Sequence, residues 1–167
     1  PGLDAGLHGH WGKYNQNNHN DGRWNEGDTG EHFSHVVKGK GLNVEKGICI
    51  KLGAGHMLSA CFDTKSLSYR AVWQDGWVNF QPFRWGSSRG ANIDGKSWFS
   101  IPKAEMPKGG EYLGLHRFGK RVVFEYQIED TRIQDEPWAG ENSFYRRIDL
   151  LNPVTKLSLP CKVMDGA

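Results

Sequence analysis

Hydrophobic and polar residues alternate with a period of two along much of the chain, most clearly between Lys46 and Trp85. In this stretch the segments ICIKL (48–52) and LSACF (58–62) flank the glycine-rich reversal Gly53-Ala54-Gly55. Such alternation is typical of half-buried β-strands, and glycine accepts the positive φ angles that a tight turn requires. The pattern predicts a β-hairpin over residues 48–62.

A second hairpin is predicted at Asp75-Gly76, which separates the alternating segment LSYRAVWQ (67–74) from WVNFQPF (77–83). Asp-Gly between two alternating segments is a strong hairpin signal because both residues tolerate a type I′ turn. The four strands of these two hairpins form the predicted centre of an all-β domain.

Further short strands are predicted downstream, each bounded by Gly, Pro, Asn or Asp. They cover Lys96–Ile101, Tyr112–His116, Arg121–Ile128, Thr131–Gln134, Ser143–Leu150 and Thr155–Val163. No stretch of useful length follows the helical period of 3.6 residues. We therefore predict one all-β domain, a two-sheet antiparallel β-sandwich of jelly-roll-like type, with a barrel as the alternative. Residues 1–40 are expected to be its irregular, loop-rich N-terminal part.

Composition narrows the possible partners. The 167 residues suit one domain with a single sizeable core, and a net charge of +2 is too small to imply nucleic acid or an anionic membrane surface. No apolar run approaches the roughly 20 residues that a membrane span needs. Because the chain opens with Pro1-Gly2-Leu3 and closes with Asp165-Gly166-Ala167, we expect it to be a domain excised from a larger protein.

The three cysteines leave one question open. Cys49 and Cys61 lie symmetrically about Gly55, so a simple hairpin would place them opposite each other on one face. They form either a cross-strand disulfide, in an oxidising compartment, or two buried thiols that pack as apolar residues. The chain has no Cys-x-x-Cys-His motif, even with Cys161 included, which excludes haem attachment within it.

Two segments of the chain resemble a known family. These are GICIKLGAGHMLSACFDTKSLSYRAVW (47–73) and YLGLHRFGKRVVFEYQIEDTRI (112–133), with CFDT and FGKRVVFEY as the most specific parts. They are similar to an uncharacterised domain family of large secreted planctomycete-type bacterial proteins that also carry c-type haem and cupredoxin-like domains. The likeness covers most of residues 42–163. It implies a secreted or periplasmic location and neighbouring haem or cupredoxin domains as partners, and it brings no catalytic residues.

Histidine, asparagine and aspartate are concentrated in the first forty residues and raise the question of a metal. His8 and His10 share one face if that piece is a strand. Alternatively, the oxygen ligands Asn20, Asp21, Glu26 and Asp28 line a structural calcium loop. Neither set follows a strict ligand spacing, so the third interpretation is a solvated loop in which these residues form turns. We expect no other cofactor within this domain.

The aromatic residues are more informative. Seven Trp is a high number for this length, and the rings are dense between Trp73 and Phe99. A sugar stacks its C–H groups on a flat indole and pairs its hydroxyls with planar polar groups. Trp73, Phe80 and Phe99 are expected to fill the core, whereas rings beside turns are expected to be exposed. The predicted ligand-binding residues are Trp77, Trp85, Trp24, Trp11, Arg84, Arg89, Asn79 and Gln81.

Motifs for catalysis are scarce. The chain has no nucleophile elbow, phosphate loop, HExxH or dinucleotide fingerprint. Carboxylate pairs such as Asp130 with Asp135 or Glu136 could serve glycoside hydrolysis if they faced each other across a sugar. Our first hypothesis is a non-catalytic, polysaccharide-binding module of a secreted redox protein. The alternatives are a structural domain that docks against haem or cupredoxin neighbours and, less favoured, a glycan-active enzyme.

Overall fold

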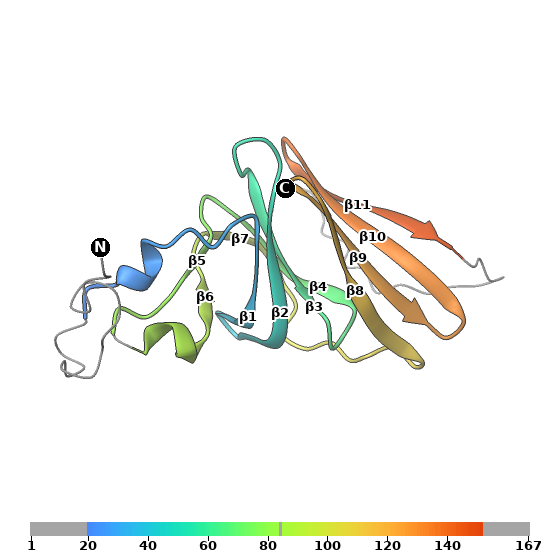
Figure 1. The fold of residues 1–167 in the computed structure, drawn as a ribbon, viewed down its shortest axis with the longest axis horizontal. Helices are drawn as coiled ribbons and strands as arrows, with labels where there is room; N and C mark the ends of the chain where they lie inside the picture. Colours follow the sequence, from blue (N-terminus) through green and yellow to red (C-terminus); the bar gives the residue numbers. More distant parts are fainter. Residues whose placement is uncertain (1–19, 84, 152–167) are drawn as a thin grey trace, which may run out of the picture.

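The computed structural model describes residues 20–83 and 85–151, and these residues are almost entirely β-structure (Figure 1). The described helices are two short 3₁₀ turns, η3 (Arg23–Asn25) and η4 (Gly86–Arg89). Within the described ranges no helix has the length and apolar character that crossing a membrane requires. The prediction of an all-β, two-sheet sandwich is confirmed.

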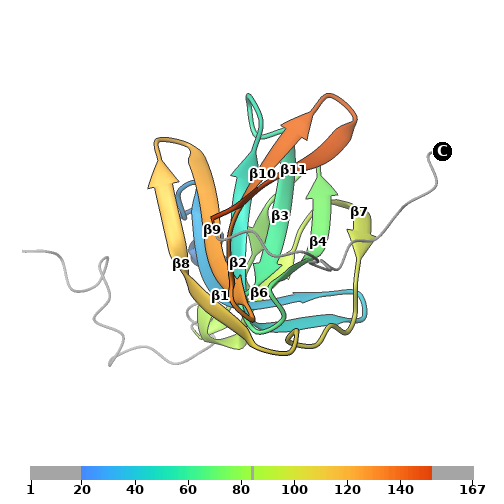
Figure 2. The same ribbon diagram turned by 90° about the vertical axis from the view of Figure 1, so that its right-hand side faces the viewer.

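Two sheets face each other. The larger sheet contains, in spatial order, β5 (Val78–Asn79), β6 (Ala91–Ile93), β1 (His32–Gly39), β2 (Leu42–Leu52), β3 (Leu58–Asp63), β4 (Ser68–Gln74) and β7 (Lys96–Ser100). The smaller sheet contains β11 (Ser143–Leu150), β10 (Thr131–Gly140), β9 (Arg121–Ile128) and β8 (Gly110–Phe118). Seen from its own side, the smaller sheet lies in front of β2, β3 and β4 (Figure 2). Strands β1–β4 and β8–β11 each pair with their neighbours in sequence, and β1 with β6 is a parallel pair.

The main core lies between the two sheets. Phe62 of β3 stacks on Phe124 of β9 with ring centroids 4.1 Å apart and an interplanar angle of 13°, and both rings are fully buried. Aliphatic and aromatic side chains surround this contact, among them Ile50, Leu58, Val72, Tyr126 and Ile133. The apolar positions of the alternating segments thus face the opposite sheet, as a period of two requires.

The larger sheet has a second core on its other face. Strand β6 pairs with β1 and β7 pairs with β4, yet only Asp94 and Gly95 separate these two strands in sequence. Three Cα–Cα steps span at most about 11 Å, so the sheet must curl until its two sides approach each other. The interior of the curl holds Val37, Leu42, Val44, Cys49, Cys61, Ala71 and Trp73. Because β3 has a core on each face, all six of its residues are buried.

The predicted hairpin at Gly53–Gly55 is confirmed, whereas the one at Asp75-Gly76 is wrong. Asp75 does turn the chain, with φ of 58°, but the segment after it pairs with β6 and the free side of β4 pairs with β7. A Cβ on Gly76 would lie 2.1 Å from the Asp94 carbonyl oxygen, so the turn is pressed against the β6–β7 connection. Trp77 then stacks on Trp73, and the strand that follows, β5, pairs with β6 at the edge of the larger sheet opposite β7.

The N-terminal part is more regular than expected. Residues 32–39, assigned to the irregular first forty residues, form β1 and pair with β2 along its length, with an irregularity between His35 and Val37. Polar residues on both faces and this irregularity interrupt the alternation that would have revealed the strand. The predicted strand Thr155–Val163 lies outside the described residues.

Cys49 and Cys61 are direct cross-strand partners, as the position of Gly55 predicted, and both are free, fully buried thiols. A hydrogen bond with Cys49, burial and the nearby Asp63 carboxylate raise the pKa of the Cys61 thiol well above its ordinary value. Of the two interpretations left open by the sequence, the structure therefore shows the buried thiols. Cys161 lies outside the described residues.

The stack between the sheets gives a first prediction. Phe124→Ala removes a ring that is fully buried on Phe62, so the free energy of unfolding should fall by about 3–5 kcal/mol. Phe118→Ala is the matched control, because this ring is 63% exposed and its loss should cost less than about 1 kcal/mol. Urea denaturation followed by tryptophan fluorescence measures both. Equal losses for the two variants would contradict the assignment of the core.

The thiol state is tested with a Cys161→Ser variant, in which only the described pair can react. Because both thiols are buried, the folded, unreduced protein should show no reaction with a thiol reagent. The same protein in denaturant, still without reductant, should give the absorbance change that corresponds to two reacting thiols. No reaction in denaturant would mean that Cys49 and Cys61 are joined by a disulfide.

Candidate functional site

Trp77, the first predicted ligand-binding ring, is half-buried rather than exposed. It stacks on Trp73 at 6.2 Å, and its indole N–H donates to Thr29 Oγ1 at 2.6 Å. Lys51 Nζ lies 5.1 Å from its ring centroid, and the His56 ring meets it edge-on at 5.5 Å. The expectation of an exposed ring at the tip of a turn is therefore wrong for Trp77, because the turn folds it onto the second core.

Trp24 and Trp85 lie elsewhere, among the 3₁₀ turns and loops at the far end of the larger sheet. Trp85 precedes η4 and is 54% exposed, whereas Trp24 in η3 is half-buried and donates its indole N–H to the Phe83 carbonyl at 3.1 Å. The Asn25 side chain also fastens η3 to this loop, since its amide donates to the Phe80 carbonyl and its oxygen accepts from Phe80 N–H.

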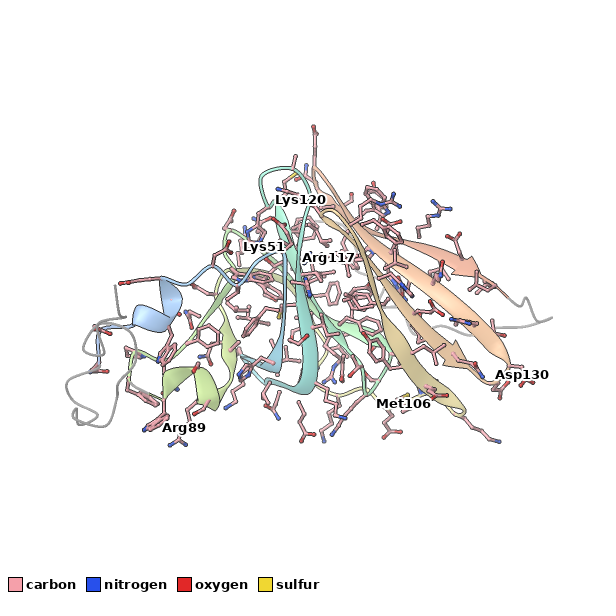
Figure 3. All side chains as sticks on the ribbon, viewed as in Figure 1. Lys51, Arg89, Met106, Arg117, Lys120 and Asp130 are labelled. Carbon is pink, nitrogen blue, oxygen red and sulfur yellow. The ribbon has the colours of Figure 1, made fainter. Side chains whose placement is uncertain are left out.

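The predicted polar residues that the structure describes lie at the same end of the larger sheet as Trp24 and Trp85. Asn79 is half-buried in β5, and Gln81 is exposed in the loop that follows, with its carbonyl oxygen against Gly86, the residue after Trp85. Arg89 is exposed in η4, at the end of the molecule farthest from the smaller sheet (Figure 3). Trp11 and Arg84 lie outside the described residues. The structure therefore separates Trp77 from Trp85 and Trp24 instead of aligning the three rings on one surface.

Exposed aromatic rings do gather on the outer face of the smaller sheet, which we define as the face directed away from the larger sheet. Phe118 on β8, Trp138 on β10 and Tyr145 on β11 are 63%, 43% and 58% exposed. Pro137, next to Trp138, is buried, and Phe144, next to Tyr145, packs against the main core, so alternation directs those two rings to solvent. Phe118 pairs with Arg121, whose neighbour Val122 is buried, so it lies on the same face. This face was not predicted from the sequence.

The three rings form one row across the strands. Phe118 pairs with Arg121 in the β8–β9 register, and Trp138 pairs with Tyr145 in the β10–β11 register. The Arg121 guanidinium joins the two halves, because it lies over the Trp138 ring with its central carbon 5.4 Å from the centroid. The order along the row is Phe118, Arg121, Trp138 and Tyr145, which we call the aromatic row.

Charged side chains beside the aromatic row are held in a fixed arrangement. Arg121 donates from Nε and Nη2 to the two oxygens of Glu136, at 2.5 and 2.8 Å. On the same face, four residues after Arg121 in β9, Glu125 accepts hydrogen bonds from Arg132, from Gln134 and from His116 Nε2, the last at 2.5 Å. Burial alone would raise the pKa of the Glu125 carboxyl, but the hydrogen bonds from these three side chains hold it below its ordinary value. Both carboxylates are buried beneath their partners.

A different polar cluster lies between the sheets. Asp135 of β10 is fully buried and accepts from Tyr126 at 3.0 Å, from Tyr69 at 3.4 Å and from Arg146 Nη2 at 2.5 Å. Burial and this carboxylate raise the pKa values of both tyrosines, which keeps their hydroxyls protonated as donors. Since Tyr69 belongs to the larger sheet, the cluster ties the two sheets together.

Beside this cluster a pocket of about 630 Å³ opens between the sheets. Phe99 and Ile101 line it from one side and Phe144 and Arg146 from the other, with Lys103 and Glu105 from the loop after β7. Its rings are engaged in packing, since Phe144 meets Tyr69 at 5.1 Å and Phe99 at 6.2 Å. None of the predicted ligand-binding residues lies here.

The carboxylates considered for glycoside hydrolysis do not converge. Asp135 points between the sheets, Glu136 points to the outer face and binds Arg121, and Asp130 lies in the β9–β10 turn at the far end of the smaller sheet (Figure 3). The arrangement therefore does not place any two of the three carboxylates across one substrate.

No metal site is found among the described residues: nowhere do three His, Cys, Asp or Glu side chains group closely enough to hold an ion. Of the proposed calcium ligands, Asp28 accepts from its own turn at Gly30 N–H, 2.7 Å away. This is the turn-forming role that the third interpretation assigned to such residues. His8 and His10 lie outside the described ranges.

Trp138 was not among the predicted ligand-binding residues, because the strand predicted in this part of the chain ended at Gln134. Proline usually marks the end of a strand, since it has no N–H to donate, and Pro137 follows shortly after. In the structure the pairing of β10 with β9 stops at Asp135, while the pairing with β11 continues to Gly140. Pro137 is therefore accommodated where one side of β10 has no ladder, and the strand extends to Trp138.

The positions of the predicted rings lead to a stability test. Trp77→Ala should lower the free energy of unfolding by about 3 kcal/mol, close to the effect of Trp73→Ala, because both rings belong to the second core. Trp85→Ala should cost less than about 1 kcal/mol, since more than half of the ring is exposed. Thermal unfolding followed by circular dichroism compares the three variants. A stable Trp77→Ala protein would show that this ring is not part of the core.

Comparison with known proteins adds one match. Residues 60–135 match a family described as a domain of unknown function, DUF6797, which is a little less than half of the chain. The matched part runs from β3 to the middle of β10 and includes strands of both sheets, together with Phe118 and Arg121. No curated protein and no solved structure gives a significant match. The expectation of an uncharacterised domain family agrees with the family that matches these residues.

Proposed function

We propose that this domain is a non-catalytic carbohydrate-binding module and that the outer face of the smaller sheet binds the glycan. The observation that carries the proposal is the aromatic row, in which Phe118, Trp138 and Tyr145 are all exposed on one sheet face. Sugar rings stack their C–H groups on such side chains, and burial of both surfaces supplies most of the binding energy.

A polar group beside the rings meets the second requirement of sugar recognition. Arg121, which lies over the Trp138 ring, is fixed by two hydrogen bonds to Glu136. Side chains that are already ordered lose little conformational entropy when they bind hydroxyl groups. Because the row is built on paired strands and not on loops, its rings are also held in a constant arrangement.

The shape of the face favours a polymer over a single sugar. The aromatic row crosses all four strands of the smaller sheet, from Phe118 on β8 to Tyr145 on β11. A chain lying across the strands meets the rings in succession, whereas a monosaccharide would use one ring and leave the others exposed. We therefore propose a polysaccharide as the ligand.

The resemblance to domains of secreted multidomain proteins suggests what such a module does. We propose that it belongs to a secreted or periplasmic protein and holds neighbouring c-type haem or cupredoxin-like domains at a polysaccharide surface. A docking domain that packs against those neighbours would use the same exposed rings. The alternatives differ in one measurable property, which is binding of the isolated domain to glycans.

Substitution of the row tests this function. Trp138→Ala and Tyr145→Ala should each weaken binding to a retained polysaccharide at least tenfold, because a few stacked rings dominate such interfaces. Affinity electrophoresis through gels containing a panel of neutral and acidic polysaccharides measures the binding. Both melting temperatures should stay close to that of the wild type, since the two rings project to solvent.

Trp85→Ala is the matched control for this experiment. Its ring is 54% exposed, similar to the 58% of Tyr145, but it lies beside η4 and away from the outer face. This variant should bind as the wild type does. Loss of binding in Trp85→Ala with none in the row variants would move the site to the η4 end. A wild type that no polysaccharide retards would favour the docking domain.

A further inference from the structure

Ion pairs on the outer face are arranged in depth, with the carboxylates below and the guanidinium groups above. The Arg121 side chain is 51% exposed, whereas its partner Glu136 is 7% exposed. The same contrast holds for Arg132, at 51%, and Glu125, at 4%. A ligand that lies over these two pairs therefore meets the guanidinium groups before the carboxylates of Glu136 and Glu125.

This arrangement gives the face a positive outer layer although its charges are nearly balanced. Coulomb interaction falls with distance, so an anion at the surface is attracted more strongly by the near guanidinium than it is repelled by the deeper carboxylate. His116, 48% exposed on Glu125, and Arg147, 61% exposed beside Asp149, lie on the same face. Lys120 in the β8–β9 turn is 82% exposed, but it forms an ion pair with Glu31, which precedes β1 of the larger sheet, and is not part of this layer (Figure 3).

Arg121 is also suited to bind an anion geometrically. A guanidinium has five N–H donors, and Arg121 uses one at Nε and one at Nη2 for its hydrogen bonds to Glu136. The remaining N–H groups of the same rigid plane are directed elsewhere, and a planar fork of this kind matches the oxygens of a carboxylate or a sulfate. Because the buried Glu136 already orders the side chain, binding costs little further entropy.

Arg121 also lies on the aromatic row, over the Trp138 ring at 5.4 Å. An acidic sugar presents a ring with C–H groups for stacking and a carboxylate or sulfate at its edge. The pair Trp138 and Arg121 offers a partner for each of these two groups at neighbouring positions. A neutral sugar would use the ring and leave the exposed side of the cation without an anionic partner.

We infer that the polysaccharide bound by the outer face is anionic, a polymer that carries carboxylate or sulfate groups, with Arg121 as the residue that selects it. This inference rests on the proposed function and specifies its ligand class. A nucleic acid is also anionic, but the net charge of +2 on the whole chain is small for such a partner.

Affinity electrophoresis of the wild type tests the ligand class. Neutral probes are xylan and mixed-linkage β-glucan, and anionic probes are polygalacturonate, alginate and a sulfated carrageenan. The anionic probes should retard the protein at least tenfold more strongly than the neutral ones, and salt should weaken that retardation, because charge interactions are screened. Fluorescence-labelled single-stranded DNA serves as a further probe and should not bind.

Substitutions test whether the arginines cause the preference for anionic polysaccharides. Arg121→Gln combined with Glu136→Gln, and Arg132→Gln combined with Glu125→Gln, remove each ion pair without leaving an unpaired buried charge. The Arg121 double variant should lose at least tenfold in affinity for the anionic probe, and the Arg132 double variant should lose less, because Arg132 lies six residues from Trp138 along β10. Both should keep their melting temperatures within a few degrees. Arg89→Gln, at the opposite end of the molecule, is the control and should bind normally.

The results distinguish a failure of the anionic ligand class from a failure of the proposed carbohydrate binding. Retardation by neutral and anionic probes alike, without dependence on salt, overturns the anionic class and leaves carbohydrate binding in place. Retardation by no polysaccharide overturns the proposed function itself. Binding to DNA as strong as to the anionic polysaccharides would overturn the inference in favour of nucleic acid. Should a double variant unfold, Arg121→Lys, which keeps the charge and loses the planar fork, provides the decisive comparison.

Discussion

The contact of Phe62 with Phe124 is the interaction on which the rest of this structure depends. It joins β3, the strand buried on both faces, to β9 of the smaller sheet. Once Phe62 faces the smaller sheet, a period of two sends Cys61 to the opposite core with Trp73 and Val37. The curl of the larger sheet then follows, because the second core must also be enclosed.

The packing of strand β10 against the core fixes which of its side chains reach the surface. Its inward residues, Ile133 and the fully buried Asp135, are held by the core and by the tyrosines around that carboxylate. Glu136 and Trp138, which follow Asp135 at alternate positions, are therefore directed outward without freedom to exchange faces. Packing between the sheets thus determines which ring and which carboxylate reach the proposed glycan-binding face.

Local pattern predicted those elements whose two faces differ in polarity or whose turn is short. Strand β9 and the β2–β3 hairpin are found where expected, and Cys49 meets Cys61 as the spacing required. The sequence could not show that the segment after Asp75-Gly76 leaves β4, because the competing partner β7 lies more than twenty residues away. Nor could it show the position of Trp77, since an aromatic residue after a turn has the same local pattern whether it is buried or exposed.

The sequence by itself determined the all-β class, most strand positions and the supply of rings, arginines and carboxylates, because these depend on local periodicity and residue type. Only the tertiary structure decided which rings are exposed together. Phe118, Arg121, Trp138 and Tyr145 come from four strands, and they align because long-range pairing and the inward burial of their neighbours set the register. The depth of each ion pair was decided in the same way, since burial of Glu125 and Glu136 depends on side chains from other strands.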